Sequence, residues 1–270
     1  MLADSQYLKR VFTLSEIEHR YGKNVHILSD PYLFTTLAHL CQPSCQQPLI
    51  NQLLNILYRE LVKAVVNAEF PLREVTVQTR MAESHPEGKF RALQVDPNTK
   101  VVCVNLARAG TVPSQICFDS FNYMLTPRGV RQDHIAINRK VDEKDQVVGT
   151  NLGGLKIGGG IAETFVVFPD PMGATGSTIR TAMEIYGDHG VAKKYIAIHL
   201  IVTPEYLSAI TQEYPQVCVY AIRLDRGLSP KKCLDSVPGT FWDEERGLND
   251  KHYIIPGAGG MGEVINNSYV

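Results

Sequence analysis

The sequence predicts an α/β protein with a mainly parallel sheet flanked by helices. Apolar runs rich in β-branched residues, the composition of buried strands, stand at 101–106, 165–168, 195–202 and 217–224. Segments with helical spacing follow the first three of these runs. Alternation of strand and helix at this period is typical of a parallel sheet, whose ligand sites lie at the carboxyl ends of the strands. Functional residues are therefore expected in the loops that follow these runs.

The composition is that of one large globular domain over residues 1–270. The chain has 270 residues, of which 44% are hydrophobic, enough for a sizeable core. Its net charge of −1 and isoelectric point near 6.7 give no electrostatic reason to expect a nucleic-acid or membrane partner. The six cysteines form no CxxC pair, and no run is apolar enough for a signal segment or a membrane span. Reduced thiols and a cytoplasmic location are expected.

The N-terminal part, residues 1–98, is predicted to be an extension with helices and some β structure. A short helix is expected at 14–21, and a second begins at Pro31, since proline is well tolerated in a first turn. The longest helix is expected at 48–67. Its apolar stripe consists of Leu49, Leu53, Leu54, Leu57, Leu61 and Val65.

Two further segments complete this N-terminal part. Residues 74–81 alternate between apolar and polar side chains, which predicts a strand. Residues 82–98 are polar and contain proline and glycine, which predicts a loop.

The stretch 164–186 carries the strongest signal for function. A buried strand at 165–168 is followed by a loop of Asp, Pro, Gly, Thr and Ser at 170–177, and a helical pattern begins at Thr178. A loop that opens a helix is a ready anion site, because the first N–H groups of the helix have no partner and its dipole is positive there. Glycines in the loop permit close approach of a ligand, and its hydroxyl groups add donors.

The sequence of this loop, DPMGATGST, narrows the kind of anion. It is not a Walker A loop, because the lysine that such a loop requires is missing. It is similar to the loop that binds phosphoribosyl pyrophosphate (PRPP) in phosphoribosyltransferases, and it most resembles the DPMLATGGS loop of the uracil phosphoribosyltransferase family. The resemblance implies PRPP binding by Asp170, Pro171, Met172, Gly173, Ala174, Thr175, Gly176, Ser177 and Thr178.

Two arginines have counterparts in the same family. Arg108 follows the strand 101–106 in the sequence LARAG, where the uracil enzymes carry LRAG and use the arginine to hold pyrophosphate. A cation with several donors at a strand end is suited to a polyphosphate. Arg139 ends a predicted strand at 134–139 and matches the arginine of the family's Tyr-Arg-Asp segment, which also reaches pyrophosphate. A helix is expected between them, at 111–125.

Three segments outside the core have separate expectations. Residues 140–160 are charged and then glycine-rich, which predicts an exposed β-arm or flap. The corresponding region of the family crosses to a second subunit, so a homodimer or higher homo-oligomer is implied. Residues 227–246 have no clear counterpart and are expected to be an inserted loop, outside a PRPP-binding core at 99–224 and before a C-terminal hood at 247–270.

The hood resembles the base-binding loop of the uracil enzymes. The sequence GLN at 247–249 and YIIPGAGGMG at 253–262 match the family's GLN and YIVPGLGDAGD. The resemblance implies that backbone groups read the uracil edge at Ile254, Gly259, Gly260 and Met261. Gly260 stands where the family has an Asp that helps to organise PRPP or its metal, and Glu263 stands at a second family Asp. In the PRPP loop, Gly173 replaces a family Leu.

The resemblance implies a uracil phosphoribosyltransferase of pyrimidine salvage, which converts uracil and PRPP to UMP and pyrophosphate with Mg²⁺. Asp170, Arg108 and Arg139 are the expected catalytic residues. Magnesium is expected to be held mainly by PRPP, with Glu263 as a candidate protein ligand. Two alternatives stay open because the hood has changed: a phosphoribosyltransferase for another base, or a regulator of the same fold that binds PRPP or a nucleotide without turnover.

Overall fold

A central eight-stranded sheet organises the molecule. The computed structural model describes residues 4–9, 12–141 and 147–269, with the backbone alone at 138–141 and 147–152. The order across the sheet is β1-β10-β9-β7-β4-β5-β6, and β8 pairs with β9 beside this path. The β5–β6 pair is antiparallel and the other pairs are parallel. The strands are β1 (Val25–Ile27), β4 (Lys100–Ala107), β5 (Val130–Val141), β6 (Val147–Lys156), β7 (Thr164–Pro169), β8 (Met172–Gly173), β9 (Lys194–Val202) and β10 (Val217–Leu224).

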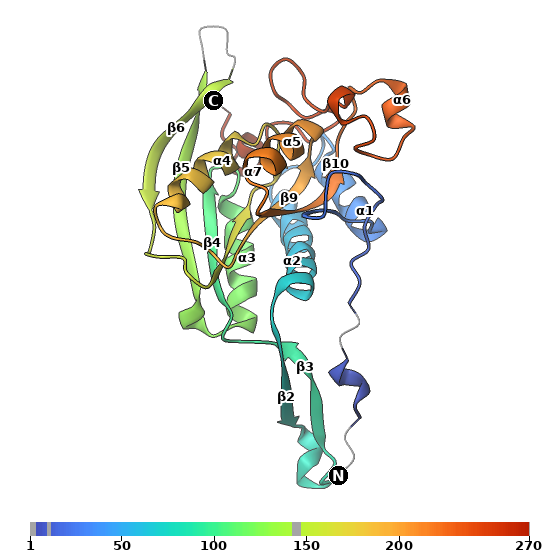
Figure 1. Ribbon diagram of the computed structural model, residues 1–270, viewed down its shortest axis with the longest axis vertical. Helices are drawn as coiled ribbons and strands as arrows, with labels where there is room; N and C mark the ends of the chain where they lie inside the picture. The colour runs from blue at the N-terminus through green and yellow to red at the C-terminus, as the bar shows by residue number, and fades with distance from the viewer. Residues whose placement is uncertain (1–3, 10–11, 142–146, 270) are drawn as a thin grey trace.

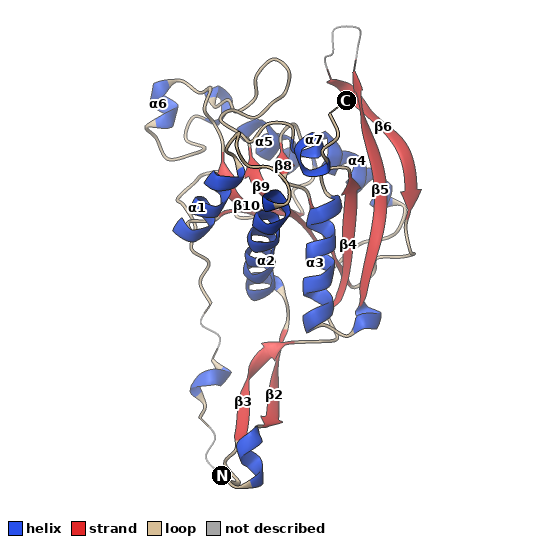
Figure 2. Ribbon diagram, turned by 180° about the vertical axis from the view of Figure 1, so that it is seen from behind, coloured by secondary structure: helices blue, strands red, loops and turns tan. Residues whose placement is uncertain are grey.

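Helices cover both faces of this sheet (Figures 1 and 2). On one face lie α2 (Leu49–Glu69) and α3 (Thr111–Met124), and on the other lie α4 (Ser177–Gly187) and α5 (Pro204–Glu213). Successive strand residues supply two separate cores, since Val101 and Cys103 join the α2 side whereas Val102 and Val104 join the α4 side. The predicted fold class, a mainly parallel sheet flanked by helices, is confirmed. No helix in the described part of the chain is long and apolar enough to cross a membrane.

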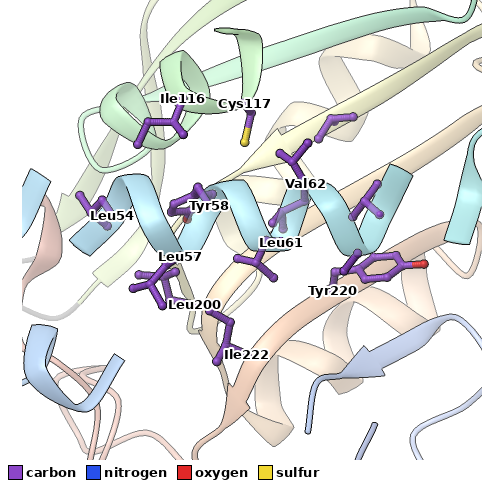
Figure 3. Packing of buried hydrophobic residues seen from close by; sticks show 14 of the residues in the cluster. Leu54, Leu57, Tyr58, Leu61, Val62, Ile116, Cys117, Leu200, Tyr220 and Ile222 are labelled. Carbon is purple, nitrogen blue, oxygen red and sulfur yellow. The ribbon is translucent and has the colours of Figure 1, made fainter. Parts of the chain in front are cut away.

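Helix α2 is the main support of the first core (Figure 3). Leu54, Leu57 and Leu61 are fully buried, and Leu57 and Leu61 point towards Leu200 of β9 and Ile222 of β10. The stripe predicted for this helix is therefore the buried face, except that Leu49 at its first turn is 46% exposed. The preceding helix α1 (Pro31–Leu40) begins as predicted, with the Asp30 carboxylate accepting the N–H groups of its first turn.

Two predictions for the N-terminal part were wrong. Residues 14–21 form no helix; they run extended beside β1, where the Ile17 N–H donates to the Ile27 carbonyl at 3.0 Å. The segment 82–98 is not simply a loop, because β3 (Lys89–Val95) pairs antiparallel with β2 (Leu72–Gln78) after the short helix η2 (Arg80–Glu83). In both cases a partner from elsewhere in the chain decided the conformation. The β2–β3 hairpin projects from the body of the molecule (Figures 1 and 2).

The predicted β-arm at 140–160 contains the end of β5 and the whole of β6, which pair as a hairpin at the sheet edge. Its tip, residues 142–146, lies outside the described residues. Residues 227–246 are mostly irregular, with the one-turn helices α6 (Lys231–Leu234) and η4 (Trp242–Glu244). This segment is tied to the body by the fully buried Glu245 carboxylate, which accepts from Arg226 Nη1 at 2.9 Å and from the Tyr21 hydroxyl. The remaining short helices are η1 (Gln6–Leu8), η3 (Pro127–Gly129) and α7 (Met261–Asn266).

Candidate active site

The candidate site lies at the carboxyl ends of the neighbouring strands β4 and β7. These strands pair in parallel, so the loops that follow them emerge side by side. The contact is close at Gly110, where an added Cβ would stand 2.9 Å from the Pro169 carbonyl oxygen and 2.7 Å from the Leu106 carbonyl oxygen. The loop that carries Arg108 and the loop that begins at Asp170 are therefore neighbours, as the sequence predicts.

The 170–176 loop is held against β9 along most of its length. Strand β8 pairs in parallel with the end of β9, with Met172 opposite Ile201. The Thr203 N–H donates to the Gly173 carbonyl at 3.1 Å, and the Thr203 hydroxyl donates to the Ala174 carbonyl at 2.7 Å. These contacts fix the loop backbone before any ligand binds.

The loop ends by opening helix α4. Gly176 is the N-cap residue, and its φ of +82° is the left-handed conformation that favours glycine. The Thr175 hydroxyl oxygen lies 3.3 Å from the Ser177 nitrogen, whose N–H donates to it, and 3.1 Å from the Ser177 hydroxyl. Thr175, Ser177 and Thr178 are all half-buried. The first N–H groups of the helix, its positive dipole end and these hydroxyls together give the geometry of an anion site.

Asp170 directly follows β7 and is 9% exposed. Its N–H donates to the Ile198 carbonyl at 3.0 Å, and its own carbonyl oxygen lies 2.6 Å from His199 Nδ1. Both backbone groups are thus fixed by β9. The structure thus places the Asp170 carboxylate at a strand end, next to the loop of Arg108.

The two predicted arginines have different outcomes. Arg108 is exposed on its loop, where its Nη1 donates to the Ser268 hydroxyl at 3.1 Å and to the Ser268 carbonyl at 3.4 Å. The Ala107–Arg108 peptide is cis. For Arg139 the backbone lies in β5, opposite Thr150 of β6, but its side chain is outside the described residues. The structure thus brings Arg108 to the site, and the role of Arg139 stays a prediction.

The C-terminal hood is anchored above these loops by two acidic residues. Asp225 accepts the Gly257 N–H at 2.7 Å, and Glu205 accepts the Gly247 N–H at 2.9 Å. Burial raises the pKa of Asp225, and the neighbouring Arg223 guanidinium, 2.6 Å away, opposes that shift. At the other end of the hood, a Cβ added to Gly262 would lie 3.8 Å from the Ala109 Cβ. The hood therefore borders the loop of Arg108.

The residues predicted to bind uracil differ in what they can offer. The side chains of Ile254 and Met261 are buried in the core of the α2 face, so only their backbone groups are available to a ligand. Gly259 is exposed and has a φ of +73°, with no atom within 4 Å of an added Cβ. This arrangement fits recognition of a base edge by backbone groups.

Glu263 takes the space that a side chain at position 260 would fill. A Cβ added to Gly260 would stand 1.6 Å from Glu263 Oε2 and 2.7 Å from Glu263 Cδ. Gly260 has a φ of −77°, which other residues adopt without strain. The carboxylate that the family carries at 260 is thus replaced in position by one that reaches back from the first turn of α7.

Sequence reasoning missed four residues that build the site. Asp225 follows strand β10 directly, the place that Asp170 has after β7, so its position in the sequence was a usable signal. Glu205, Ser268 and His199 carry no such signal. Their partners Gly247, Arg108 and Asp170 are between 29 and 160 residues away along the chain.

The sheet, the helix-opening loop after β7 and the neighbouring arginine loop after β4 define the fold class of the type I phosphoribosyltransferases. Within that class, the chain belongs to the uracil phosphoribosyltransferase family, whose model matches residues 27–241. The hood lies beyond this range.

Individual relatives agree with this membership. A uracil phosphoribosyltransferase of Campylobacter curvus is 26% identical over 250 residues, covering 91% of this chain and 99% of that protein. One of Thermococcus sibiricus is 32% identical over 101 residues, which is 37% of this chain and 35% of the relative. The match thus spans about a third of that relative's length. Among solved structures, the AQ2163 protein of Aquifex aeolicus has the same fold, with a TM-score of 0.69 and 22% identity over 91% of this chain and 99% of that one.

Proposed function

We propose that this protein transfers the phosphoribosyl group of PRPP to uracil, giving UMP and pyrophosphate in pyrimidine salvage. The observation that carries the proposal is the fixed 170–176 loop. It places an acid at a strand end and opens a helix within contact of the Arg108 loop. In the reaction, a bond forms between a uracil ring nitrogen and the anomeric carbon, the bond from that carbon to pyrophosphate breaks with its electron pair leaving on pyrophosphate, and the proton of the nitrogen is released to water.

The site residues have distinct parts in this reaction. The N–H groups and hydroxyls from Thr175 to Thr178 would hold the 5′-phosphate. The Asp170 carboxylate would accept hydrogen bonds from the ribose hydroxyls, and its negative charge would stabilise the positive charge that develops at the anomeric carbon. The Arg108 guanidinium, positioned by Ser268, would hold the departing pyrophosphate. Rate enhancement would come mainly from positioning and charge stabilisation.

Magnesium fits this site as an ion carried by the substrate. Its preferred ligands are oxygens, and Glu263 supplies a half-buried carboxylate beside Gly260, one residue after the Gly262 that borders the Arg108 loop. Glu263 is the protein ligand we assign to it, with PRPP supplying most of the others. When bound, the ion would offset the negative charge of the pyrophosphate.

The changed hood is the reason to consider two other functions. Position 260 has no side-chain carboxylate, and the carboxylate of Glu263 takes that space instead. This exchange changes the surface next to the proposed base site. This favours, as second candidates, transfer to another nucleobase or binding of PRPP or a nucleotide without turnover. Any of the three would use the same PRPP loop.

The deciding measurement is UMP formation from uracil and PRPP with magnesium. Asp170→Asn is expected to abolish most turnover, while Asp188→Asn, the same substitution at the exposed far end of α4, leaves it unchanged. Thr175→Val is expected to weaken PRPP binding by about 1–3 kcal/mol through a lost phosphate hydrogen bond. Unchanged rate and PRPP affinity in both site variants would refute the proposal. Turnover of a different base would make that base, in place of uracil, the substrate. Binding of UMP without turnover would favour a regulator that binds the nucleotide and does not catalyse the reaction.

A further inference from the structure

A buried histidine and tyrosine lie directly beneath the PRPP loop. His199 of β9 is completely buried, and Tyr206 of α5 is 1% exposed. Polar rings are rarely placed at such depth unless their polar atoms have partners, because an unpaired buried group costs as much as a lost hydrogen bond. The partners of these two rings lead to Asp170.

The hydrogen bonds run in one direction, from Tyr206 through His199 to Asp170. His199 Nδ1 is 2.6 Å from the Asp170 carbonyl oxygen, and a carbonyl can only accept, so Nδ1 carries the proton. Nε2 is then the acceptor for the Tyr206 hydroxyl, also at 2.6 Å. Burial lowers the pKa of His199 to about 4, and burial together with the Asp170 charge raises the pKa of Tyr206. Both rings are therefore neutral at pH 7, with a single proton arrangement.

The tyrosine also explains the glycine in the loop. A Cβ on Gly173 would stand 3.1 Å from the Tyr206 ring atoms Cγ and Cδ1, and 2.9 Å from Val202 Cγ1. The family loop has a leucine at this position. The space beside the loop that a leucine side chain would enter is thus filled from α5 by Tyr206. Gly173, Tyr206 and His199 form one packed unit, which we name the loop support.

The contact reaches the proposed catalytic acid through its backbone. The Asp170 N–H is held by Ile198 and its carbonyl by His199, which are consecutive residues of β9. With both neighbouring peptide groups fixed, the direction of the Cα–Cβ bond that carries the carboxylate is fixed as well. Losing the His199 donor would leave the buried Asp170 carbonyl without this partner and free its backbone to rotate.

We propose that His199 and Tyr206 are positioning residues that hold Asp170 in the orientation needed for phosphoribosyl transfer. They touch no substrate and act through the Asp170 backbone. The proposal rests on the proposed function, because the task assigned to Asp170 is contact with the ribose of PRPP. The proposal requires two hydrogen bonds. A neutral side chain at position 199 must donate to the Asp170 carbonyl, and a hydroxyl group must donate to that side chain from its other side.

The test compares His199→Leu with His199→Asn. Both replacements are similar in size, but only Asn retains an N–H donor that reaches the Asp170 carbonyl from the position of Nδ1. We expect His199→Leu to lower kcat for UMP formation about 10- to 100-fold with the KM for uracil unchanged, and His199→Asn to recover most of it. Tyr206→Phe, which removes only the hydroxyl, should lower kcat less, by about 5-fold.

Tyr220→Phe is the matched control. Tyr220 is fully buried and its hydroxyl donates to Glu69 at 2.8 Å, a buried tyrosine hydrogen bond that does not involve Asp170. A merely structural role for the loop support predicts that all these variants lower the unfolding midpoint and leave kcat alone. Equal kcat in wild type, His199→Leu and Tyr206→Phe would overturn the proposal while leaving the proposed function intact.

Failure of the proposed function gives a different result. If the wild type turns over no base, PRPP affinity measured by calorimetry takes the place of kcat. The proposal then requires His199→Leu to bind PRPP at least about 5-fold more weakly than His199→Asn, because the ribose contact of Asp170 is disturbed in one and kept in the other. Equal affinities, or a wild type that binds no PRPP, would overturn it.

Discussion

Lowering the pH should destabilise this protein through His199 in particular. The imidazole is completely buried, and burial lowers its pKa from 6.5 to about 4 in the folded chain. The unfolded chain takes up a proton near pH 6.5, whereas the folded chain does not do so until about pH 4. Stability from this residue is therefore complete above pH 6.5 and is lost as the pH falls from 6.5 towards 4.

The size of the effect follows from the width of that window. One pKa unit corresponds to about 1.4 kcal/mol, so the whole window is worth about 3 kcal/mol. Between pH 7 and pH 5 the free energy of unfolding should fall by about 2 kcal/mol through His199 alone. This is a large share of the 5–15 kcal/mol that is typical of a folded protein.

Urea unfolding at pH 7 and pH 5 measures this difference when wild type and His199→Asn are compared. The variant lacks the titrating group, so its loss of stability should be smaller by about 2 kcal/mol. His19, whose pKa is also lowered by burial, is present in both proteins and cancels in the comparison. Equal losses in wild type and variant would show that His199 is not held neutral by burial, and would refute the reasoning.

Three further predictions concern the hood, the loop and assembly. Gly260→Asp should raise UMP formation by restoring a carboxylate at position 260, once the Glu263 side chain rotates out of the 1.6 Å overlap. Glu263→Gln alone should weaken PRPP binding. A Gly260→Asp protein that is inert toward uracil, together with a wild type that is active on another base, would contradict the uracil assignment. Gly173→Leu should lower the free energy of unfolding by about 1–3 kcal/mol in urea through overlap with Tyr206 and Val202, and an unchanged Gly173→Leu protein would refute the packing argument. Light scattering should find a homodimer in which part of 140–160 packs on a second copy, and a monomer at micromolar concentration would speak against it.

The projecting β2–β3 hairpin adds a second arm to the assembly prediction. Val77 and Phe90 face each other across its strands and are 47% and 49% exposed. A half-exposed apolar pair gains free energy when it is removed from water, so this pair favours burial against another chain. Replacing both residues with Thr should weaken the dimer measured by light scattering, and a dimer of unchanged affinity would leave 140–160 as its remaining candidate.

The sequence by itself was sufficient for features that are contiguous along the chain. Helix α2 and strands β4, β7, β9 and β10 followed from periodicity, because each buries its own apolar residues against a neighbouring layer. The PRPP loop was predictable for a similar reason, since its acid, glycines and hydroxyls lie within nine consecutive residues. Its position beside Arg108 also followed, because parallel strands bring their carboxyl ends to one edge.

Only the tertiary structure decided what depends on pairing between distant residues. The expected helix at 14–21 became an extended segment beside β1, and 82–98 gained a strand by pairing with β2. The support of Asp170 by His199, and the reach of Glu263 into the place of a side chain at 260, left no pattern in the sequence. Local composition sets which conformations a segment favours, but the burial and hydrogen bonds that select among them come from the rest of the fold.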